Sequence, residues 1–275
     1  MGRAIVTALI PEHDVTMFSR GITGRDLFPE VPRLIGDREA GDYTALKDGS
    51  WDAVVDTSGY VPRHVDQAMD ALGERVSRYL FVSSHAVYRL DSTVADESAP
   101  LRDPIREPGV LTDATYGPAK VACEQDVVAR FGDRASILRP GKVAGPHDDQ
   151  EGLTYWVRET ARGGRVELPG DPGQPVQLID VRDLAVLALR LIVDGRGGAF
   201  NAVGPSLTIT EVIETCAAAA GTSVEIVPVP ERRAPLLQPD RPWATRRRSG
   251  AKARAAGMPS TPLAVTAADV LAGLG

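Results

Sequence analysis

Short strand-like runs alternate with helical stretches through the first half of the chain, and this alternation restricts the possible folds more than any other feature. The strand-like runs are rich in β-branched and aromatic residues and read DVTMF, PRLIG, DAVVDT, RYLFVSS and ASILRP. Helical periodicity predicts helices over Pro62–Leu72 and Tyr116–Arg130. Because strands that alternate with helices form parallel sheets, the sequence predicts an α/β fold with a doubly wound parallel sheet.

The remaining length suits a substrate-binding addition to that sheet. A chain of 275 residues with 43% hydrophobic and 25% charged residues has the composition of one globular α/β domain. We therefore expect a single domain over residues 1–275. Residues from about 144 to 182 and from about 220 to 275 are expected to form a small C-terminal substrate lobe.

Three residues have the chemistry of a carbonyl-reducing site. Ser84 ends the run FVSS, and Tyr116 and Lys120 stand four residues apart in YGPAK, which places them one above the other on a helix. A free phenol titrates near ~10, and a nearby ammonium favours the phenolate, so we expect Lys120 to lower the pKa of Tyr116. Tyr116 would then exchange a proton with a substrate oxygen that Ser84 also holds. Pro118 is expected in the first turn of the helix, where its missing N–H costs nothing.

These residues and two further motifs resemble a known family. FVSSHAVY, YGPAK, LRPGKVAGPHD and VQLIDVRDLA occur in order and are similar to the extended short-chain dehydrogenase/reductase family. Within it they resemble the NAD-dependent epimerase/dehydratase group and a reductase-like subgroup. The resemblance implies a Rossmann-like fold, an oxidoreductase or epimerase activity, and catalytic roles for Ser84, Tyr116 and Lys120.

The N-terminal sequence departs from that family. Members begin with a strand and a Gly-x-x-Gly-x-x-Gly turn, whereas this chain begins MGRAIVTALI and keeps only the last glycine, Gly2. Its apolar residues have helical spacing and predict a helix that ends at Pro11. The missing strand is the central one of the 3-2-1-4-5-6 order, and a gap there would leave buried backbone groups unpaired at ~1–3 kcal/mol each. We therefore expect an N-terminally truncated or remodelled sheet, through either a misplaced start or a naturally shortened relative.

The cofactor prediction depends on the ends of the strands. The expected second strand ends in FSRG, so Ser19 stands where the family has an acid for NAD, and Arg20 follows it, which favours NADP(H) over NAD(H). Without the glycine turn, this form of the chain could instead bind no dinucleotide. The resemblance also places the following residues beside the cofactor: Gly2, Asp37, Arg38, Thr57, Ser58, Gly59, Lys120, Pro140, Gly141 and Val143. For residues 57 to 59, backbone turn chemistry is an equal explanation.

The substrate-facing candidates follow strand ends and the loop after ASILRP. They are Tyr60, His85, Lys142, His147 and Gln177. Two functions remain open on this evidence. The first is an NADP(H)-dependent oxidoreductase or epimerase acting on a carbonyl or secondary alcohol of a small molecule. The second is a non-redox protein on the same scaffold, either a cofactor-independent acid–base catalyst or a binding and regulatory module.

Composition and cysteine spacing limit which kinds of partner and which cellular compartment we expect. A net charge of -6 disfavours nucleic-acid binding. Cys123 and Cys216 lie far apart without metal-like spacing, so we expect reduced thiols, no metal and a cytoplasmic protein. Apolar runs fall well short of the ~18–20 residues that span a bilayer, so no membrane partner is expected. The family resemblance implies a homodimer.

Overall fold

The computed structural model describes residues 1–148, 150–239 and 241–274, which fold into two compact units. The first unit comprises Met1–Tyr88, Leu101–Arg139 and Ala188–Phe200. The second comprises Arg89–Pro100, Pro140–Leu187 and the residues from Asn201 onward. The predicted lobe segments, 144–182 and 220–275, begin within this second unit.

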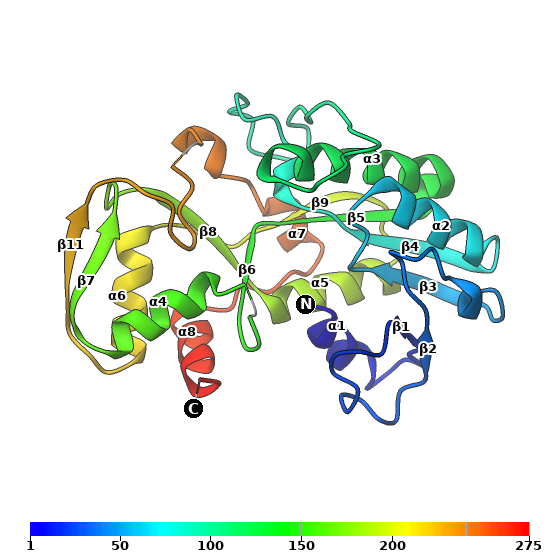
Figure 1. Cartoon of the computed structure of the whole chain (residues 1–275), viewed down its shortest axis with the longest axis horizontal. Helices are drawn as coiled ribbons and strands as arrows, with labels where there is room; N and C mark the ends of the chain where they lie inside the picture. The colour runs from blue at the N-terminus through cyan, green and yellow to red at the C-terminus, as the bar shows by residue number, and fades with distance from the viewer. Residues whose placement is uncertain (149, 240, 275) are drawn as a thin grey trace. The chain divides into compact units, whose positions relative to one another are not determined.

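The first unit contains a parallel sheet with helices packed on it (Figure 1). Its helices are α1 (Gly2–Leu9), α2 (Pro62–Leu72) and α3 (Asp113–Phe131), with short 3-10 turns η1 (Thr44–Leu46), η2 (His85–Val87) and η3 (Gly132–Arg134). Its strands are β1 (Met17–Ser19), β2 (Arg33–Ile35), β3 (Trp51–Asp56), β4 (Val76–Val82) and β5 (Ala135–Pro140). Helix α5 (Val181–Val193) and strand β9 (Gly198–Ala202) contribute residues to both units. Each of the five strand-like runs overlaps one of the strands β1 to β5, so the predicted α/β fold with a parallel sheet is confirmed.

The strands of this unit form two separate sheets. One has the order β3-β4-β5-β9, with β3, β4 and β5 parallel, and the other is the parallel pair β1-β2. Among the described residues, no strand joins β1 to β3. Phe18 of β1 and Val54 of β3 nevertheless pack against one hydrophobic cluster, which includes Tyr43, Val65 and Phe81. The two sheets therefore share a core although their backbones are not paired.

Helix α3 begins earlier than its sequence pattern predicts. Its N-cap is Thr112, whose hydroxyl accepts a hydrogen bond from the Thr115 N–H, so Pro118 lies inside the helix and not in its first turn. Pro118 has no N–H to donate to the carbonyl of Ala114, four residues earlier. The guanidinium of Arg102 replaces that donor at 2.8 Å. The prediction of Pro118 in the first turn is wrong because the helix begins at the Thr112 cap, and Arg102 compensates for the bond that the proline cannot make.

The second unit has its own sheets and its own core. Its strands are β6 (Lys142–Ala144), β7 (Gly164–Pro169), β8 (Pro175–Asp180), β10 (Ser206–Thr208) and β11 (Val224–Val229). They pair in the orders β10-β8-β6 and β11-β7. Its helices are α4 (Gly152–Ala161), α6 (Ile209–Ala219), α7 (Ala251–Ala255) and α8 (Leu263–Ala272), with the turn η4 (Trp243–Arg246). Trp156, Leu168 and Ile213 are among the fully buried residues of its hydrophobic cluster.

Two further expectations can be compared with the structure. Cys123 in α3 and Cys216 in α6 are buried free thiols, as predicted. In the described part of the chain, no helix combines the length and apolar character that a membrane span requires.

Candidate active site

Ser84 and Tyr116 meet where β4 ends against helix α3. Ser84 is the N-cap of η2, and its hydroxyl accepts a hydrogen bond from the Ala86 N–H at 3.1 Å. The Ser84 side chain also interacts with the Tyr116 phenol and lowers its pKa. Close packing makes this possible, because a Cβ on Gly117 would lie only 2.1 Å from the Ala86 carbonyl oxygen. The glycine after Tyr116 therefore lets the helix approach the turn that carries Ser84.

The phenol of Tyr116 is not activated in the way we predicted. Burial raises the pKa of Tyr116 above its ordinary value of 10, while the interaction with Ser84 lowers it without cancelling the effect of burial. The expected lowering by Lys120 is not among the influences on Tyr116. That part of the prediction is wrong because the ammonium of Lys120 is directed elsewhere.

Lys120 is buried between two strand ends. Only 2% of the residue is exposed, and its Nζ donates to the backbone carbonyls of Gly59 at 2.6 Å and Val82 at 2.8 Å. The ammonium also lies 4.3 Å from the ring centre of Phe81 and 5.5 Å from that of Tyr60, which is close enough for cation–π attraction. Burial lowers the pKa of Lys120 from 10.5 to about 8. Near neutral pH the group is still mostly charged, and a modest change in its surroundings would release its proton.

The turn after β3 is built around the Asp56 carboxylate. Its Oδ1 accepts the backbone N–H groups of Ser58 and Gly59, both at 3.0 Å, and its Oδ2 accepts the Tyr79 hydroxyl at 2.7 Å. Arg38 completes the arrangement with an ion pair of 3.0 Å. The Asp56 side chain is fully buried, and every one of these partners lies within the first unit.

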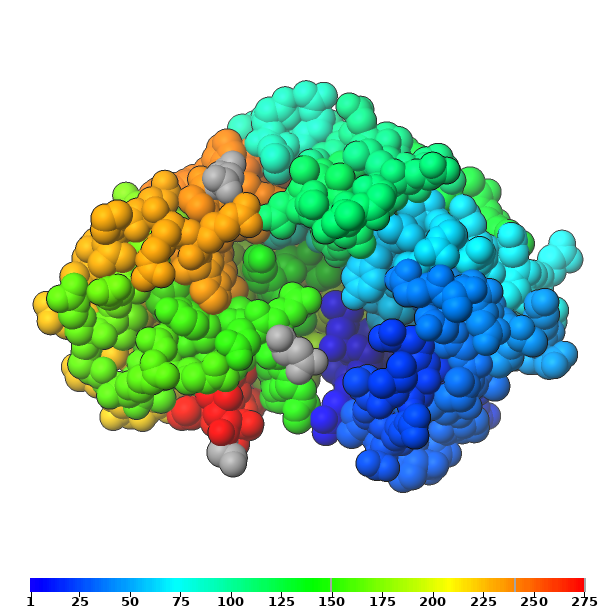
Figure 2. Space-filling model, viewed as in Figure 1, coloured from blue at the N-terminus to red at the C-terminus, as the bar shows by residue number. Residues whose placement is uncertain are grey.

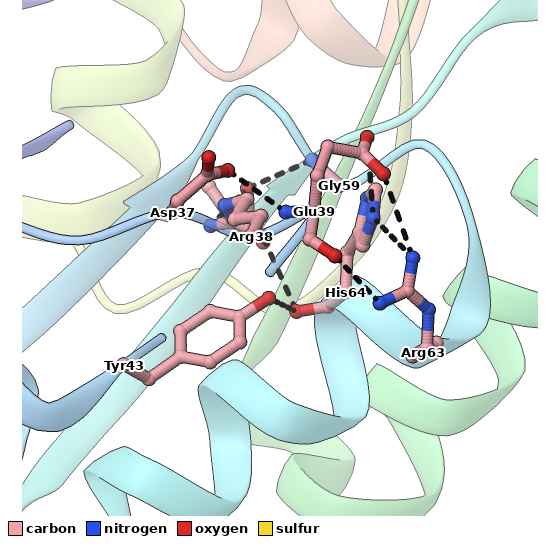
Figure 3. Close-up of polar contacts among 8 residues, drawn as sticks. Asp37, Arg38, Glu39, Tyr43, Gly59, Arg63 and His64 are labelled. Atoms are coloured by element: carbon pink, nitrogen blue, oxygen red, sulfur yellow. Dashed lines mark hydrogen bonds and ion pairs between the residues drawn. The ribbon is translucent and has the colours of Figure 1, made fainter. Parts of the chain in front are cut away.

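Figure 3 shows how the segment after β2 docks beside this turn. The carboxylate of Asp37 accepts the Glu39 N–H at 2.9 Å, which is local turn chemistry. The guanidinium of Arg38 lies near the His64 carbonyl, which also accepts the Tyr43 hydroxyl at 2.9 Å. Both predicted adenine-side residues therefore already have protein partners.

A second buried ion pair, between Arg139 and Glu124, lies near the candidate residues and joins β5 to α3. Arg139 of β5 donates to both carboxylate oxygens of Glu124 in α3, at distances of 2.5 to 3.2 Å, and to the Tyr88 hydroxyl at 2.9 Å. The Ser83 hydroxyl donates to the same carboxylate at 2.5 Å. Ser83 precedes Ser84 in the chain, and Glu124 follows Lys120 by one helical turn. The network therefore links the backbone segments that carry Ser84 and Lys120.

The end of β1 borders an arginine-lined cavity of about 320 Å³. Its lining residues belong to the N-terminal segment, which is coloured blue in Figure 2. Its lining residues are Arg20, Gly21, Arg25, Arg33 and Ile35. Arg25 donates to the Gly21 carbonyl, and Arg33 donates to the Leu27 carbonyl at 3.0 Å. The Ser19 hydroxyl faces the neighbouring backbone, where it accepts the Gly21 N–H at 3.3 Å. The lining thus carries three guanidinium groups and no carboxylate.

The NAD dependent epimerase/dehydratase family matches residues 51–203, which is more than half of the chain. The chain belongs to this family. It is accordingly an epimerase/dehydratase family enzyme, and the family predicted from the sequence motifs is confirmed. No curated protein matches the sequence.

Solved structures confirm the family fold over nearly the full length. A provisionally assigned epimerase from Burkholderia cenocepacia is 23% identical, with a TM-score of 0.78 and coverage of 99% of this chain and 94% of that one. The UDP-glucose 4-epimerase of Thermus thermophilus, solved with NAD, is 19% identical, with a TM-score of 0.73 and the same coverages. The protein RMD from Pseudomonas aeruginosa, solved with NADPH, is 23% identical, with a TM-score of 0.67 and coverages of 94% and 98%.

The structure divides the predicted site residues of this family enzyme between the two units. The first unit holds Gly2, Ser19, Arg20, Asp37, Arg38, Thr57, Ser58, Gly59, Tyr60, Ser84, His85, Tyr116 and Lys120. A Cβ on Gly2 would lie 3.8 Å from the Thr57 hydroxyl oxygen, so the start of α1 reaches the end of β3. His85 lies in η2 directly after Ser84 and is partly exposed.

The second unit holds Pro140, Gly141, Lys142, Val143, His147 and Gln177. His147 is exposed and has a positive φ of 66°. Gln177 is buried, and its amide donates to the carbonyls of Gly204 at 3.1 Å and Arg248 at 2.9 Å. The substrate roles of these residues stay predictions.

Sequence reasoning missed three residues that shape the site: Asp56, Glu124 and Arg139. Asp56 and Arg139 lie at the ends of expected strands, and Glu124 lies one helical turn beyond Lys120, so the positions of all three could be read from the sequence. Their side-chain partners could not, because these contacts span 15 to 51 residues of chain. A charged residue at the buried end of a strand was the one available signal.

Proposed function

We propose that this family enzyme is an NADP(H)-dependent oxidoreductase or epimerase that acts on a carbonyl or secondary alcohol of a small molecule. The pairing of Ser84 with Tyr116, whose pKa the serine lowers, together with the ammonium of Lys120 buried one helical turn away, is the observation that supports this proposal best. A phenol paired with a serine can pass its proton to a substrate oxygen. NADP(H) would supply the hydride chemistry when bound.

The arginine-lined cavity supports NADP(H) over NAD(H). A dinucleotide's adenosine ribose is read at the end of the strand that β1 represents, where an acid suits the 2′-hydroxyl of NAD and an arginine suits the 2′-phosphate of NADP. This chain has Ser19 at that point and three guanidinium groups around the cavity. Charge-assisted bonds from arginine to phosphate are among the strong hydrogen bonds of proteins. The N-terminus of α1, close to Thr57, would attract the pyrophosphate.

The solved relatives suggest where to look for the substrate. They include UDP-glucose 4-epimerases and the UDP-glucuronic acid 4-epimerase of Bacillus cereus. Nucleotide-linked sugars are therefore the first class of small molecule to test. The residues of the second unit, 144–182 and 220–275, are proposed to contribute the substrate-binding elements.

Dinucleotide binding tests the proposal directly. We would titrate the 275-residue chain with NADPH and with NADH and follow nicotinamide fluorescence. We expect saturable binding of NADPH and weaker binding of NADH. Arg20→Gln should weaken NADPH binding about tenfold, because it removes one charge-assisted bond to phosphate, and should leave NADH unchanged.

Arg254→Gln provides a matched control, because this exposed arginine lies in the second unit and outside the cavity. Equal affinity for both dinucleotides, insensitive to Arg20→Gln, would contradict the choice of NADP(H). Absence of binding by the folded chain would contradict the redox function altogether.

The separation of β1-β2 from the four-stranded sheet favours a second candidate. In dinucleotide-binding folds, the strand between these two groups leads into the phosphate loop. A non-redox protein on the same scaffold, using Ser84 and Tyr116 for acid–base chemistry or serving as a binding module, would need no such loop. A folded chain that fails to bind either dinucleotide would support this candidate.

A further inference from the structure

The position of the Lys120 ammonium depends on one backbone carbonyl that a strand does not fix. Of its two acceptors, the Val82 carbonyl belongs to β4 and is held by the sheet. The Gly59 carbonyl, at 2.6 Å, belongs to the turn that follows β3. What fixes that turn therefore also fixes the ammonium.

Asp56 fixes the turn through its side chain. Both N–H groups that bind its Oδ1 belong to the turn, and the second is that of Gly59 itself. An aspartate that accepts backbone N–H groups two and three residues ahead determines the local backbone conformation. These two bonds hold the backbone nitrogens of Ser58 and Gly59, and so fix the residue that carries the carbonyl.

Tight packing leaves the turn little freedom to move. A Cβ on Gly59 would lie 2.6 Å from a methyl of Val65 and 2.9 Å from the ring of Phe81. Both distances are shorter than a real Cβ contact, so the turn is pressed against α2 and β4. Only a glycine allows the carbonyl of this residue to reach Lys120 from here.

Arg38 balances the charge that this arrangement buries. Its guanidinium contacts both carboxylate oxygens of Asp56, at 3.0 and 3.2 Å. An unpaired carboxylate at a fully buried position would be costly, and the pairing offsets part of that cost. Arg38 thus has a structural task, which differs from the cofactor contact that the family resemblance implies.

We propose that Asp56 is a positioning residue for Lys120, acting through the backbone carbonyl of Gly59, with Arg38 as its charge partner. The proposal adds a support to the site described above, and its catalytic meaning rests on the proposed function. The positioning of the Lys120 ammonium by Asp56 does not depend on the proposed function. It can therefore be tested without substrate or cofactor.

The charged and titratable groups around Lys120 determine what a charge change should do. Cys123, Asp56 and Glu124 favour its charged form, whereas Arg38 disfavours it. The ring of Tyr60 also faces the ammonium, with its centre 5.5 Å from Nζ. Replacing Asp56 by a neutral residue removes a favourable charge and leaves Arg38 unbalanced, so both effects act to lower the pKa of Lys120.

The first test measures the reactivity of Lys120 in the Asp56→Asn variant. Competitive acetylation with acetic anhydride over a range of pH, followed by peptide mass spectrometry, reports the pKa and the accessibility of each lysine, with Lys47 as the internal reference. Asparagine keeps an oxygen for the turn but loses the charge. A fall of about one pKa unit from about 8 would raise the uncharged fraction of Lys120 at pH 7 roughly fivefold.

The second variant, Gly59→Ala, keeps the charge and displaces the carbonyl. Here we expect faster acetylation of Lys120 even at high pH, where the amine is uncharged, because one of its two acceptors has moved. Asp180→Asn serves as the control, since Asp180 is an equally buried, arginine-paired carboxylate of the second unit. Its variant should leave Lys120 unchanged.

The outcomes separate the proposal from its alternatives. Unchanged acetylation of Lys120 in both folded variants would overturn the role of Asp56. A change of equal size in Asp180→Asn would overturn it too, because the effect would then reflect general destabilisation. Failure of the parent chain to bind NADPH would contradict the proposed function and leave this measurement intact.

Discussion

At the residue scale, the interaction of Ser84 with Tyr116 lowers the pKa of the phenol against the effect of burial. We predict that Ser84→Ala raises the pKa of Tyr116 further, because the phenolate loses a donor. The titration of Tyr116 can be followed by NMR with ¹³Cζ-labelled tyrosine, in which the Tyr116→Phe variant assigns the signal. We further predict that this same Tyr116→Phe variant abolishes turnover and leaves the fold intact.

Ser84→Thr is the control for this titration, because threonine keeps the hydroxyl. Its Tyr116 signal should titrate close to that of the parent chain. A Tyr116 signal that titrates alike in Ser84→Ala and in the parent would show that the Ser84 hydroxyl has no influence on the phenol.

Burial of Lys120 makes the stability of the chain depend on pH. Its pKa falls from 10.5 to about 8 in the folded state, so between these values the unfolded chain binds more protons than the folded chain. Stability therefore rises with pH through this window, and the penalty is fully present below pH 8. We predict that the parent chain gains about 3 kcal/mol relative to Lys120→Met from pH 7 to pH 10.5.

Urea unfolding of both proteins across this range measures the difference. Other groups that titrate there contribute to both proteins and cancel in the subtraction. A free-energy difference that stays constant with pH would mean that the lysine is not perturbed by burial.

At the element scale, the Glu124–Arg139 pair joins α3 to β5 with both side chains less than a tenth exposed. Removing one partner leaves a buried charge without its counterion. We predict that Glu124→Gln lowers the free energy of unfolding by roughly 3–5 kcal/mol, and that the double variant Glu124→Gln/Arg139→Met recovers much of the loss. Chemical denaturation of the three proteins gives the comparison, and a double variant no more stable than the single one would contradict the ion-pair explanation.

The elements show where sequence reasoning succeeds and where it stops. Periodicity located β5 and α2 at their observed bounds, because apolar spacing is a local property. The predicted start of α3 is wrong because the local capping box of Thr112 and Thr115 was not recognised in the sequence. The donor from Arg102, which lies outside the periodic pattern, then allows Pro118 inside the helix.

The candidate site, like the helices and strands, could be predicted only in its local features. The spacing of Ser84, Tyr116 and Lys120 can be read from the sequence, whereas the direction of the Lys120 ammonium cannot. That direction follows from the Gly59 carbonyl, 61 residues away along the chain. Contacts of this range appear only once the chain is folded.

At the scale of the whole molecule, the described strands of the first unit divide into a larger sheet with buried central strands and a small pair that is only partly buried. Strands β4 and β5 are largely buried, whereas β1 and β2 have three residues each and no fully buried position. An isolated two-stranded pair is marginally stable in water. The small sheet therefore depends on its side-chain packing against the shared hydrophobic core for its order.

We predict that β1 and β2 open locally while the larger sheet stays closed. In native-state hydrogen exchange, the amides of Phe18 and Leu34 should exchange with a low opening free energy that is insensitive to urea, because little surface is exposed. Those of Leu80 and Leu138 should exchange only through global unfolding. NADPH bound at the arginine-lined cavity would slow exchange in β1 and β2 selectively, because three of the five lining residues lie at the end of β1 or within β2. Equal protection of both sheets without ligand would show that the shared core alone holds the small sheet as firmly as backbone pairing holds the large one.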